Sequence, residues 1–300
     1  MRHLKLQLTA LILVLLLFLG TILVFYVMTL EEEGAQPTQR TDLPVQYQPL
    51  TCQFFTRQLF EQNITAQPYT LDGALLAAVV PHYEPMLSRS ASMLAAAKEE
   101  DYDTVVVIGP NHSGEGPQII VSGDSWNTPD GLLEGNRELA QLLLANSRIQ
   151  AAEDRERTEA EWSVSVHMPY LREFFPEAKV VTVLLARGAK TSALQTLAQV
   201  LSQQAAEQKV LVLGSVDFSH YQTPDEAERR DVQTQVLIEE GDVEALRRLR
   251  GENLDSPETI SVILYLKGDR ELQLLEHPFE TYWENGTERA ASYFLYAVTQ

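Results

Sequence analysis

The sequence contains a single cysteine, Cys52, among its 300 residues. One cysteine cannot form an intrachain disulfide, so a folded domain in this chain must be stabilised by its own hydrophobic core. About 250 residues follow the N-terminal segments described below, which is enough chain to bury such a core within one domain. We therefore expect a single domain without covalent cross-links.

Basic residues are also scarce, because 23 Lys and Arg residues stand against 42 Asp and Glu residues, for a formal net charge of −19. Two of the basic residues and none of the acidic ones lie in residues 1–30, so the remaining chain has a net charge of −21. A surface of this sign repels phosphate backbones, which excludes nucleic acid as an expected partner.

Residues 8–30 form a long uncharged apolar run of 23 residues. As a helix this run would be roughly 35 Å long, enough to cross the hydrocarbon core of a bilayer. The alternative is a cleaved signal peptide, whose apolar region is shorter and ends at a small-x-small site; neither feature is present. We predict an uncleaved single-pass transmembrane helix that holds the protein in the cell membrane.

Charges that flank this run predict its orientation. Arg2 and Lys5 precede it and Glu31, Glu32 and Glu33 follow it, which places the N-terminus in the cytoplasm and the main domain outside. Residues 31–50 are polar, contain proline and lack periodicity, as is typical of a flexible tether. The expected organisation is a cytoplasmic tail and anchor over residues 1–30, a tether over 31–50 and one α/β domain over 51–300.

Short apolar runs alternate with helical stretches in the predicted domain. Strands are predicted at 75–80, 104–109, 179–186 and 209–215, with helices at 88–100 and 191–207. Runs this apolar are typical of strands buried on both faces of a sheet. The predicted fold is a three-layer α/β/α domain with a largely parallel or mixed central sheet. Residues 224–267 are predicted to be mostly helical, and residues 288–300 to form a closing strand.

Three of the six histidines come just after predicted strands: His82, His112 and His220. In open α/β sheets the loops beyond the carboxyl ends of the strands meet at a ligand crevice, so these side chains are expected to converge there. Each histidine alone has another explanation, as a turn cap or a satisfied core group. Their shared position after a strand favours a common site.

Further candidates accompany these histidines. Asp217 lies three residues before His220 and is expected to orient an imidazole or to bind a ligand itself, the alternative being a turn cap. His167 lies on a predicted helix that approaches the same crevice, and we include it as a catalytic candidate, although a lone histidine on a helix more often serves packing. His277 is expected to be structural.

Four segments carry a family resemblance: VVPHYEP at 79–85, VIGPNHSG at 107–114, EWSVSVHMPYL at 161–171 and GSVDFSHYQ at 214–222. In order and rough spacing they resemble the Memo-like family, whose prokaryotic members are called AmmeMemoRadiSam system protein B. The resemblance implies a fold similar to that of class III extradiol ring-cleaving dioxygenases.

The resemblance also implies a metal site. Its ligands would be His82, His112 and a third residue near the C-terminus, which is a cysteine in Memo proteins. This chain lacks that cysteine; the aligned position is Asp255, with Glu258 three residues beyond. Two histidines and a carboxylate form the facial triad of non-haem iron oxygenases, and the cofactor implied is a divalent Fe, Cu or Zn ion. His220 would act as acid and base, oriented by Asp217.

The third segment departs from the family pattern. The family usually has Glu-His-Ser-x-Glu where this chain has Glu161-Trp162-Ser163-Val164-Ser165, so one histidine and one glutamate are missing. The leading hypothesis is a membrane-anchored Memo-like protein with metal-dependent, dioxygenase-like redox chemistry on a small-molecule substrate. The alternatives are a non-catalytic binding or scaffolding protein and a zinc-dependent hydrolase. The sequence names no protein partner and does not decide whether the chain is an enzyme.

Overall fold

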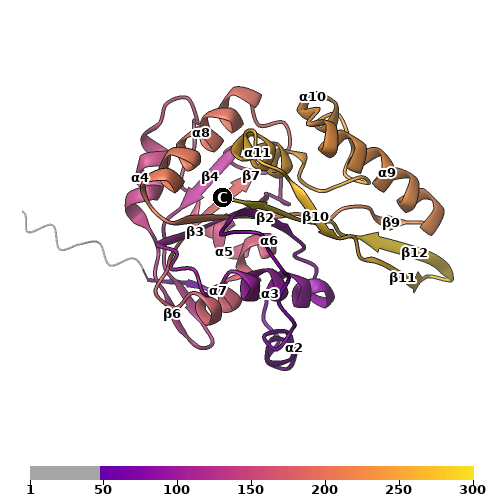
Figure 1. The fold of residues 1–300 in the computed structure, drawn as a ribbon, viewed down its shortest axis with the longest axis horizontal. Coiled ribbons are helices and arrows are strands. Elements are labelled where there is room, and N and C mark those ends of the chain that lie inside the picture. Colours follow the sequence, from indigo (N-terminus) through magenta and orange to yellow (C-terminus); the bar gives the residue numbers. More distant parts are fainter. Residues whose placement is uncertain (1–47) are drawn as a thin grey trace, which may run out of the picture. The chain divides into compact units, whose positions relative to one another are not determined.

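Residues 48–300 are described by the structure, a computed structural model, and they form a mixed α/β fold (Figure 1). The predicted anchor at 8–30 and nearly all of the predicted tether lie outside the described residues. None of the helices within 48–300 has the length and apolar character that a bilayer crossing requires. The domain boundaries predicted at residues 30 and 50 stay predictions.

A seven-stranded sheet in the order β10-β13-β2-β8-β3-β7-β4 forms the centre of the fold. Its four inner strands run parallel and coincide with the four predicted ones: β2 (Leu75–Val80), β8 (Val210–Ser215), β3 (Thr104–Pro110) and β7 (Lys179–Leu185). The outer strands run antiparallel to their neighbours: β4 (Ile119–Ser122), β13 (Leu295–Thr299) and β10 (Gln273–Glu276). The sheet is therefore mixed, with a parallel centre.

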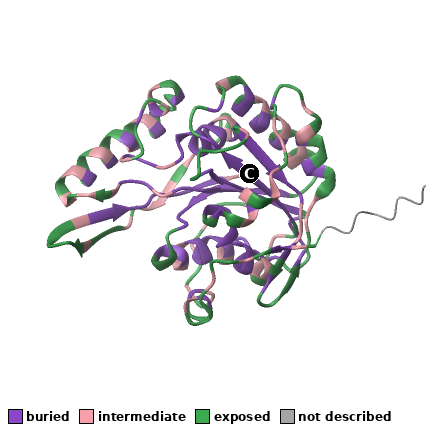
Figure 2. Ribbon diagram, turned by 180° about the vertical axis from the view of Figure 1, so that it is seen from behind, coloured by how far each residue is buried: buried purple, intermediate pink, exposed green. Residues whose placement is uncertain are grey.

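Helices cover both faces of this sheet (Figures 1 and 2). One face packs against α4 (Arg137–Ala145), α8 (Thr191–Glu207) and α11 (Pro257–Lys267). The other packs against α3 (Leu87–Ala96), α6 (Trp162–Ser165) and α7 (Met168–Phe174). Strand β3 divides between the two cores, since Val106 and Ile108 join one and Val105 and Val107 the other. Because successive side chains of a strand point to opposite faces, a strand between two helical layers must be apolar throughout.

The sequence predicts one helix in the segment 161–171, but the structure contains two short helices there. Helix α6 ends at Ser165 and α7 begins at Met168, with His167 at the junction and Pro169 in the first turn of α7. A proline at this position has no amide hydrogen to donate, so it suits a helix start and not a helix interior. The break turns the polar end of α6 toward the carboxyl ends of the strands.

The predicted helical region 224–267 is confirmed and contains α9 (Pro224–Glu240), α10 (Val243–Leu246) and α11. The predicted closing strand divides into two, because β12 (Thr287–Ser292) belongs to another sheet than β13. That second sheet has the order β11-β12-β9, with β11 (Phe279–Glu284) and β9 (His220–Gln222). It projects from the side of the domain, and β9 carries His220 (Figure 1).

The remaining elements are short. They are β1 (Leu50–Thr51), β5 (Trp126–Thr128) and β6 (Gly131–Leu133), which form a third sheet, with α2 (Arg57–Asn63), α5 (Arg155–Ala160) and the 3-10 helix η1 (Glu84–Met86).

Candidate metal centre

Three polar side chains meet at the carboxyl ends of neighbouring parallel strands. His82 follows β2 and His112 follows β3, and β8 lies between these two strands in the sheet. Asp255 comes from the loop that leads into α11, whose N-cap is Ser256. One ligand atom from each of His82, His112 and Asp255 lies within 4.8 Å of the others. The structure therefore brings together the three residues that the sequence predicts as metal ligands.

The Asp255 carboxylate lies between the two imidazoles. Its Oδ2 is 3.1 Å from Nε2 of His82 and 3.7 Å from Nε2 of His112. Ligands held at about 2.1 Å from one first-row metal ion are about 3.0 to 3.4 Å apart in tetrahedral or octahedral geometry. The 3.1 Å separation lies within this range and the 3.7 Å separation is about 0.3 Å above it, so a small side-chain adjustment lets one ion contact both imidazoles and the carboxylate. The other oxygen, Oδ1, is buried and has no hydrogen-bond partner among the described residues, so its lone pairs are also available to a cation.

The tautomer of His82 is set from behind by Ser215. The Ser215 hydroxyl donates to the Ser163 carbonyl at 2.6 Å and lies 3.0 Å from Nδ1 of His82. Because its single hydrogen is used, Ser215 Oγ must accept a hydrogen from the imidazole. His82 then carries its proton on Nδ1 and presents the Nε2 lone pair to the cluster, as a metal ligand requires.

Glu161 performs the same task for His112. Its Oε1 accepts from Nδ1 of His112 at 2.7 Å, and its Oε2 accepts from the His112 backbone amide at 2.9 Å. The carboxylate is fixed in turn because Glu161 is the N-cap of α6, where Oε1 also accepts from the Ser163 amide. Trp162 stacks on the His112 ring, with 4.0 Å between centroids. The ring is thereby oriented with Nε2 toward Asp255.

The electrostatics of the metal-free cluster favour a cation at its centre. Burial opposes protonation of His112, but hydrogen bonds to Asp255 and Glu161 outweigh it and raise its pKa to about 9. Burial likewise opposes protonation of His82, but the charges of Asp217 and Asp255 raise its pKa. The Asp255 pKa is lowered because the two imidazoles outweigh its burial. Without a metal, the protonated imidazoles supply the positive charge that the surrounding carboxylates stabilise.

Asp217 belongs to the cluster. The sequence predicts that it orients His220, but its contacts are with His82. Its Oδ1 accepts from the His82 amide at 3.0 Å, and its Oδ2 lies 3.6 Å from Nε2 of His82. The hydrogen bond that orients His220 runs instead from Nδ1 to the Phe218 carbonyl, at 2.6 Å. The reason is the tight turn after β8, which places the main chain of Phe218 beside the His220 ring.

His167 lies behind the cluster and outside the cavity. It is fully buried, and its Nε2 is 3.0 Å from the same Ser215 hydroxyl that contacts His82. Burial, together with the charge on His82, lowers the His167 pKa to about 3, so the ring is neutral. Its placement makes it a positioning residue that acts through Ser215, and its predicted catalytic role has no contact to support it.

A cavity of about 670 Å³ opens in front of the cluster. His82, His112, Asp217, His220 and Asp255 line its floor. Its walls are mostly aromatic and include Phe54, Tyr83, Trp162, Tyr221, Tyr282 and Tyr293. The arrangement is that of a small-molecule site, in which apolar walls hold a ligand against a few convergent polar groups.

Two supporting residues were missed at the sequence level. Ser215 gives no local signal, since a serine at the end of an apolar strand is ordinary, and its role follows only from the packing of α6 against β3 and β8. Glu161 was noted as part of a motif, but its bond to His112 was not predicted, because 49 residues separate the two. Glu258, noted beside Asp255, is buried elsewhere and accepts from the Gly188 amide.

Comparisons with known proteins identify the family of the chain. The family model described as Memo-like protein matches residues 53–295. A MEMO1 family protein of Methanococcoides burtonii is 35% identical over 159 residues, which cover 52% of this chain and 59% of that protein. A MEMO1 family protein of Archaeoglobus fulgidus is 30% identical over 161 residues, covering 53% of this chain and 60% of that protein. The chain thus spans about three fifths of the length of these relatives.

Among solved structures, an uncharacterized protein of Escherichia coli K12, JW3007, aligns with a TM-score of 0.49 and 14% identity. The alignment covers 74% of this chain and 99% of that one.

Proposed function

This chain belongs to the Memo-like protein family, and we propose that it is a metal-binding member that uses His82, His112 and Asp255 as ligands. The observation that carries the proposal is the pair of Nε2 atoms aimed at one carboxylate oxygen, 3.1 and 3.7 Å away. Hydrogen bonds from both Nδ1 atoms to Ser215 and Glu161 support it, since metal-binding histidines are held in this way.

The donor set suits a divalent Fe, Cu or Zn ion. A bound ion would polarise a substrate or water molecule at the floor of the cavity, and we propose dioxygenase-like redox chemistry on a small molecule as the reaction. His220 is the proton carrier in this proposal. Its Nδ1 donates to the Phe218 carbonyl, so Nε2 of the neutral ring is free to accept a proton within the cavity.

Elemental analysis of the full chain, purified without oxygen, tests the metal site. We expect one transition-metal ion per chain, and its loss in His112→Ala and in Asp255→Asn, which preserves the size of the side chain. His220→Gln is the matched control, because His220 lines the cavity but is not one of the three ligands. A parent protein without metal, or ligand variants that keep it, would refute the proposal.

A second candidate is a non-catalytic binding protein, and the stacking of Trp162 on His112 favours it. The indole covers one face of the ring at 4.0 Å and occupies space beside the cluster. A third candidate, a zinc-dependent hydrolase, rests on the same donor set. Turnover with Zn²⁺ in the absence of oxygen would select the hydrolase, and oxygen consumption with Fe²⁺ would select the dioxygenase. Absence of both reactions in metal-loaded protein would select the binding protein.

We also propose that residues 8–30 anchor the protein in the cell membrane with the domain outside. The support is the uncharged apolar run, with basic residues before it and acidic residues after it. Protease treatment of intact cells tests the orientation, since an outward-facing domain is degraded while a cytoplasmic control protein survives. A protected domain, or protein recovered without membranes after cell lysis, would contradict this placement.

A further inference from the structure

We propose that the aromatic cavity binds an organic cation, specifically a primary ammonium group carried on an aromatic or other apolar body. The inference names the ligand class of the cavity in the proposed function, and it rests on that cavity being the ligand site. It does not require the metal, because the aromatic rings and Glu84 lie in the cavity wall and are not metal ligands.

The first feature is the sign of the charge around the cavity. Among the described residues that line it, no lysine or arginine occurs, whereas Glu84, Asp217 and Asp255 are acidic. The chain beyond residue 30 also carries a net charge of −21. Long-range attraction therefore favours cations, and the described lining offers no lysine or arginine to pair with a phosphate or carboxylate.

The second feature is the number of ring faces in the wall. Tyr83 and Tyr293 lie parallel, with 5.9 Å between centroids and 4° between planes. Tyr221 and Tyr282 line the same cavity, as does Trp162, which stacks on His112. The negative face of an aromatic ring attracts ammonium groups, and cavities that combine several such faces select for them.

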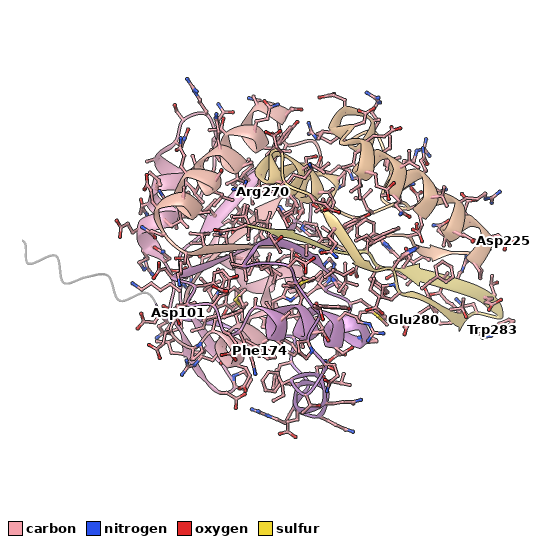
Figure 3. The ribbon with its side chains drawn as sticks, viewed as in Figure 1. Asp101, Phe174, Asp225, Arg270, Glu280 and Trp283 are labelled. Atoms are coloured by element: carbon pink, nitrogen blue, oxygen red, sulfur yellow. The ribbon has the colours of Figure 1, made fainter. Side chains whose placement is uncertain are left out.

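The third feature is a carboxylate behind the tyrosines. Glu280 lies on β11, on the hairpin that projects from the domain (Figure 3). The Glu280 charge acts on both Tyr83 and Tyr293. Glu280 and Glu84 therefore add negative potential at this wall. A ligand with an ammonium group would meet rings and carboxylates together.

An aromatic ring of this wall already holds a cation in the structure. The Arg57 guanidinium lies 5.0 Å from the centroid of Phe55, and its Nη1 donates to both carboxylate oxygens of Asp130 at 3.0 Å. Phe55 is one of the lining residues, while Arg57 is held outside the cavity by Asp130.

Three probes of similar size and different charge test the proposal: 2-phenylethylammonium, 2-phenylethanol and phenylacetate. Binding to the full chain is measured by calorimetry, first after metal removal with a chelator and then after loading with Zn²⁺. We expect the amine to bind about tenfold more tightly than the alcohol, and the alcohol more tightly than the anion. Equal binding of amine and alcohol, tighter binding of phenylacetate, or no binding of any probe would overturn the proposal.

Variants assign the preference to the wall. Tyr83 is exposed at the cavity mouth, so Tyr83→Leu should fold and lose most of the amine preference, whereas Tyr83→Phe keeps the ring face and should retain it. Glu84→Gln should reduce the preference, and Glu138→Gln, an exposed position on α4 outside the cavity, should not. An unchanged preference in Tyr83→Leu and Glu84→Gln would contradict the assignment.

The two proposals fail in different ways. If the metal site is absent, elemental analysis finds no ion, yet the chelated parent and His112→Ala still prefer the amine. If the cation site is absent, the protein holds metal but does not distinguish the amine from the alcohol.

Discussion

The hydroxyl oxygen of Ser215 lies 3.0 Å from Nδ1 of His82, at the carboxyl end of β8. The same oxygen is 3.0 Å from Nε2 of His167 and donates its hydrogen to the Ser163 carbonyl. One buried hydroxyl therefore accepts from two imidazoles and ties the end of the sheet to α6. The position of Ser215 is set by packing, and it determines which nitrogen of His82 and of His167 carries the proton.

Replacement of Ser215 by alanine should weaken metal binding by about 10- to 100-fold and lower the free energy of unfolding by about 1 to 3 kcal/mol. The cause is the loss of an acceptor for two buried N–H groups. Ser165→Ala is the matched control, because Ser165 is equally buried but its hydroxyl has no partner among the described residues. Metal titration and chemical denaturation measure both effects. Equal behaviour of the two variants would argue against this role.

Glu161→Gln should lower the pKa of His112 in the metal-free protein from about 9 and weaken metal binding. The carboxylate stabilises the imidazolium by charge and by accepting from Nδ1, and a neutral amide supplies less of both. An NMR titration of the His112 ring in chelated protein follows the pKa. A pKa that stays at its parent value would show that Asp255 alone raises it.

His167 should make the metal-free protein less stable in acid. Its pKa is about 3 in the folded protein against an ordinary value of 6.5, so between these pH values the unfolded chain takes up a proton that the folded ring refuses. The free energy of unfolding then falls as the pH falls below 6.5, by at most about 1.4 kcal/mol per pH unit. Above pH 6.5 this effect disappears.

The raised pKa of His112 has the opposite effect on stability, because its contribution to the free energy of unfolding is complete below pH 6.5 and is lost as the pH rises through about 9.

The variant His167→Gln removes only the dependence on the acid side, because the amide keeps a donor for Ser215 but does not titrate. Denaturation of the parent and of His167→Gln gives the free energy of unfolding of each at several pH values from 4 to 7. This free energy should fall more steeply toward acid in the parent than in the variant. Parallel curves would mean that His167 is protonated or solvated in the folded state.

Gly109→Ala should destabilise the fold by about 1 to 3 kcal/mol and disturb metal binding with it. A Cβ at this position would lie 2.6 Å from Oγ of Ser163 and 3.3 Å from Cγ1 of Val164, so α6 must shift and carry Glu161 with it. Gly251→Ala is the control, because a Cβ there meets nothing within 4 Å. Thermal unfolding and metal titration of the two variants provide the comparison, and a neutral Gly109→Ala would show that α6 adjusts freely.

Predictions from the sequence were most accurate where a local pattern had one physical solution. The four apolar runs had to be strands covered on both faces, and the inner strands of the sheet lie at those runs. The segment 161–171 was less predictable, because its periodicity fits one helix and only the proline in α7 marks the break. The projecting sheet was not predicted, since β9 is three residues long and its partner β12 lies 65 residues further along the chain.

The sequence by itself determined that His82 and His112 leave strands of one sheet at the same edge, since both follow apolar runs typical of parallel strands buried on both faces. The family resemblance had already indicated Asp255 as the third ligand. Tertiary structure alone decided that Ser215 and Glu161 accept from the Nδ1 atoms of these histidines and that His220 donates to the Phe218 carbonyl. The physical reason is how far apart in the sequence the interacting residues lie. Apolar periodicity involves residues a few positions apart, so it can be recognised in the sequence. Hydrogen bonds between residues 49 to 133 positions apart exist only after the sheet and its helices have packed.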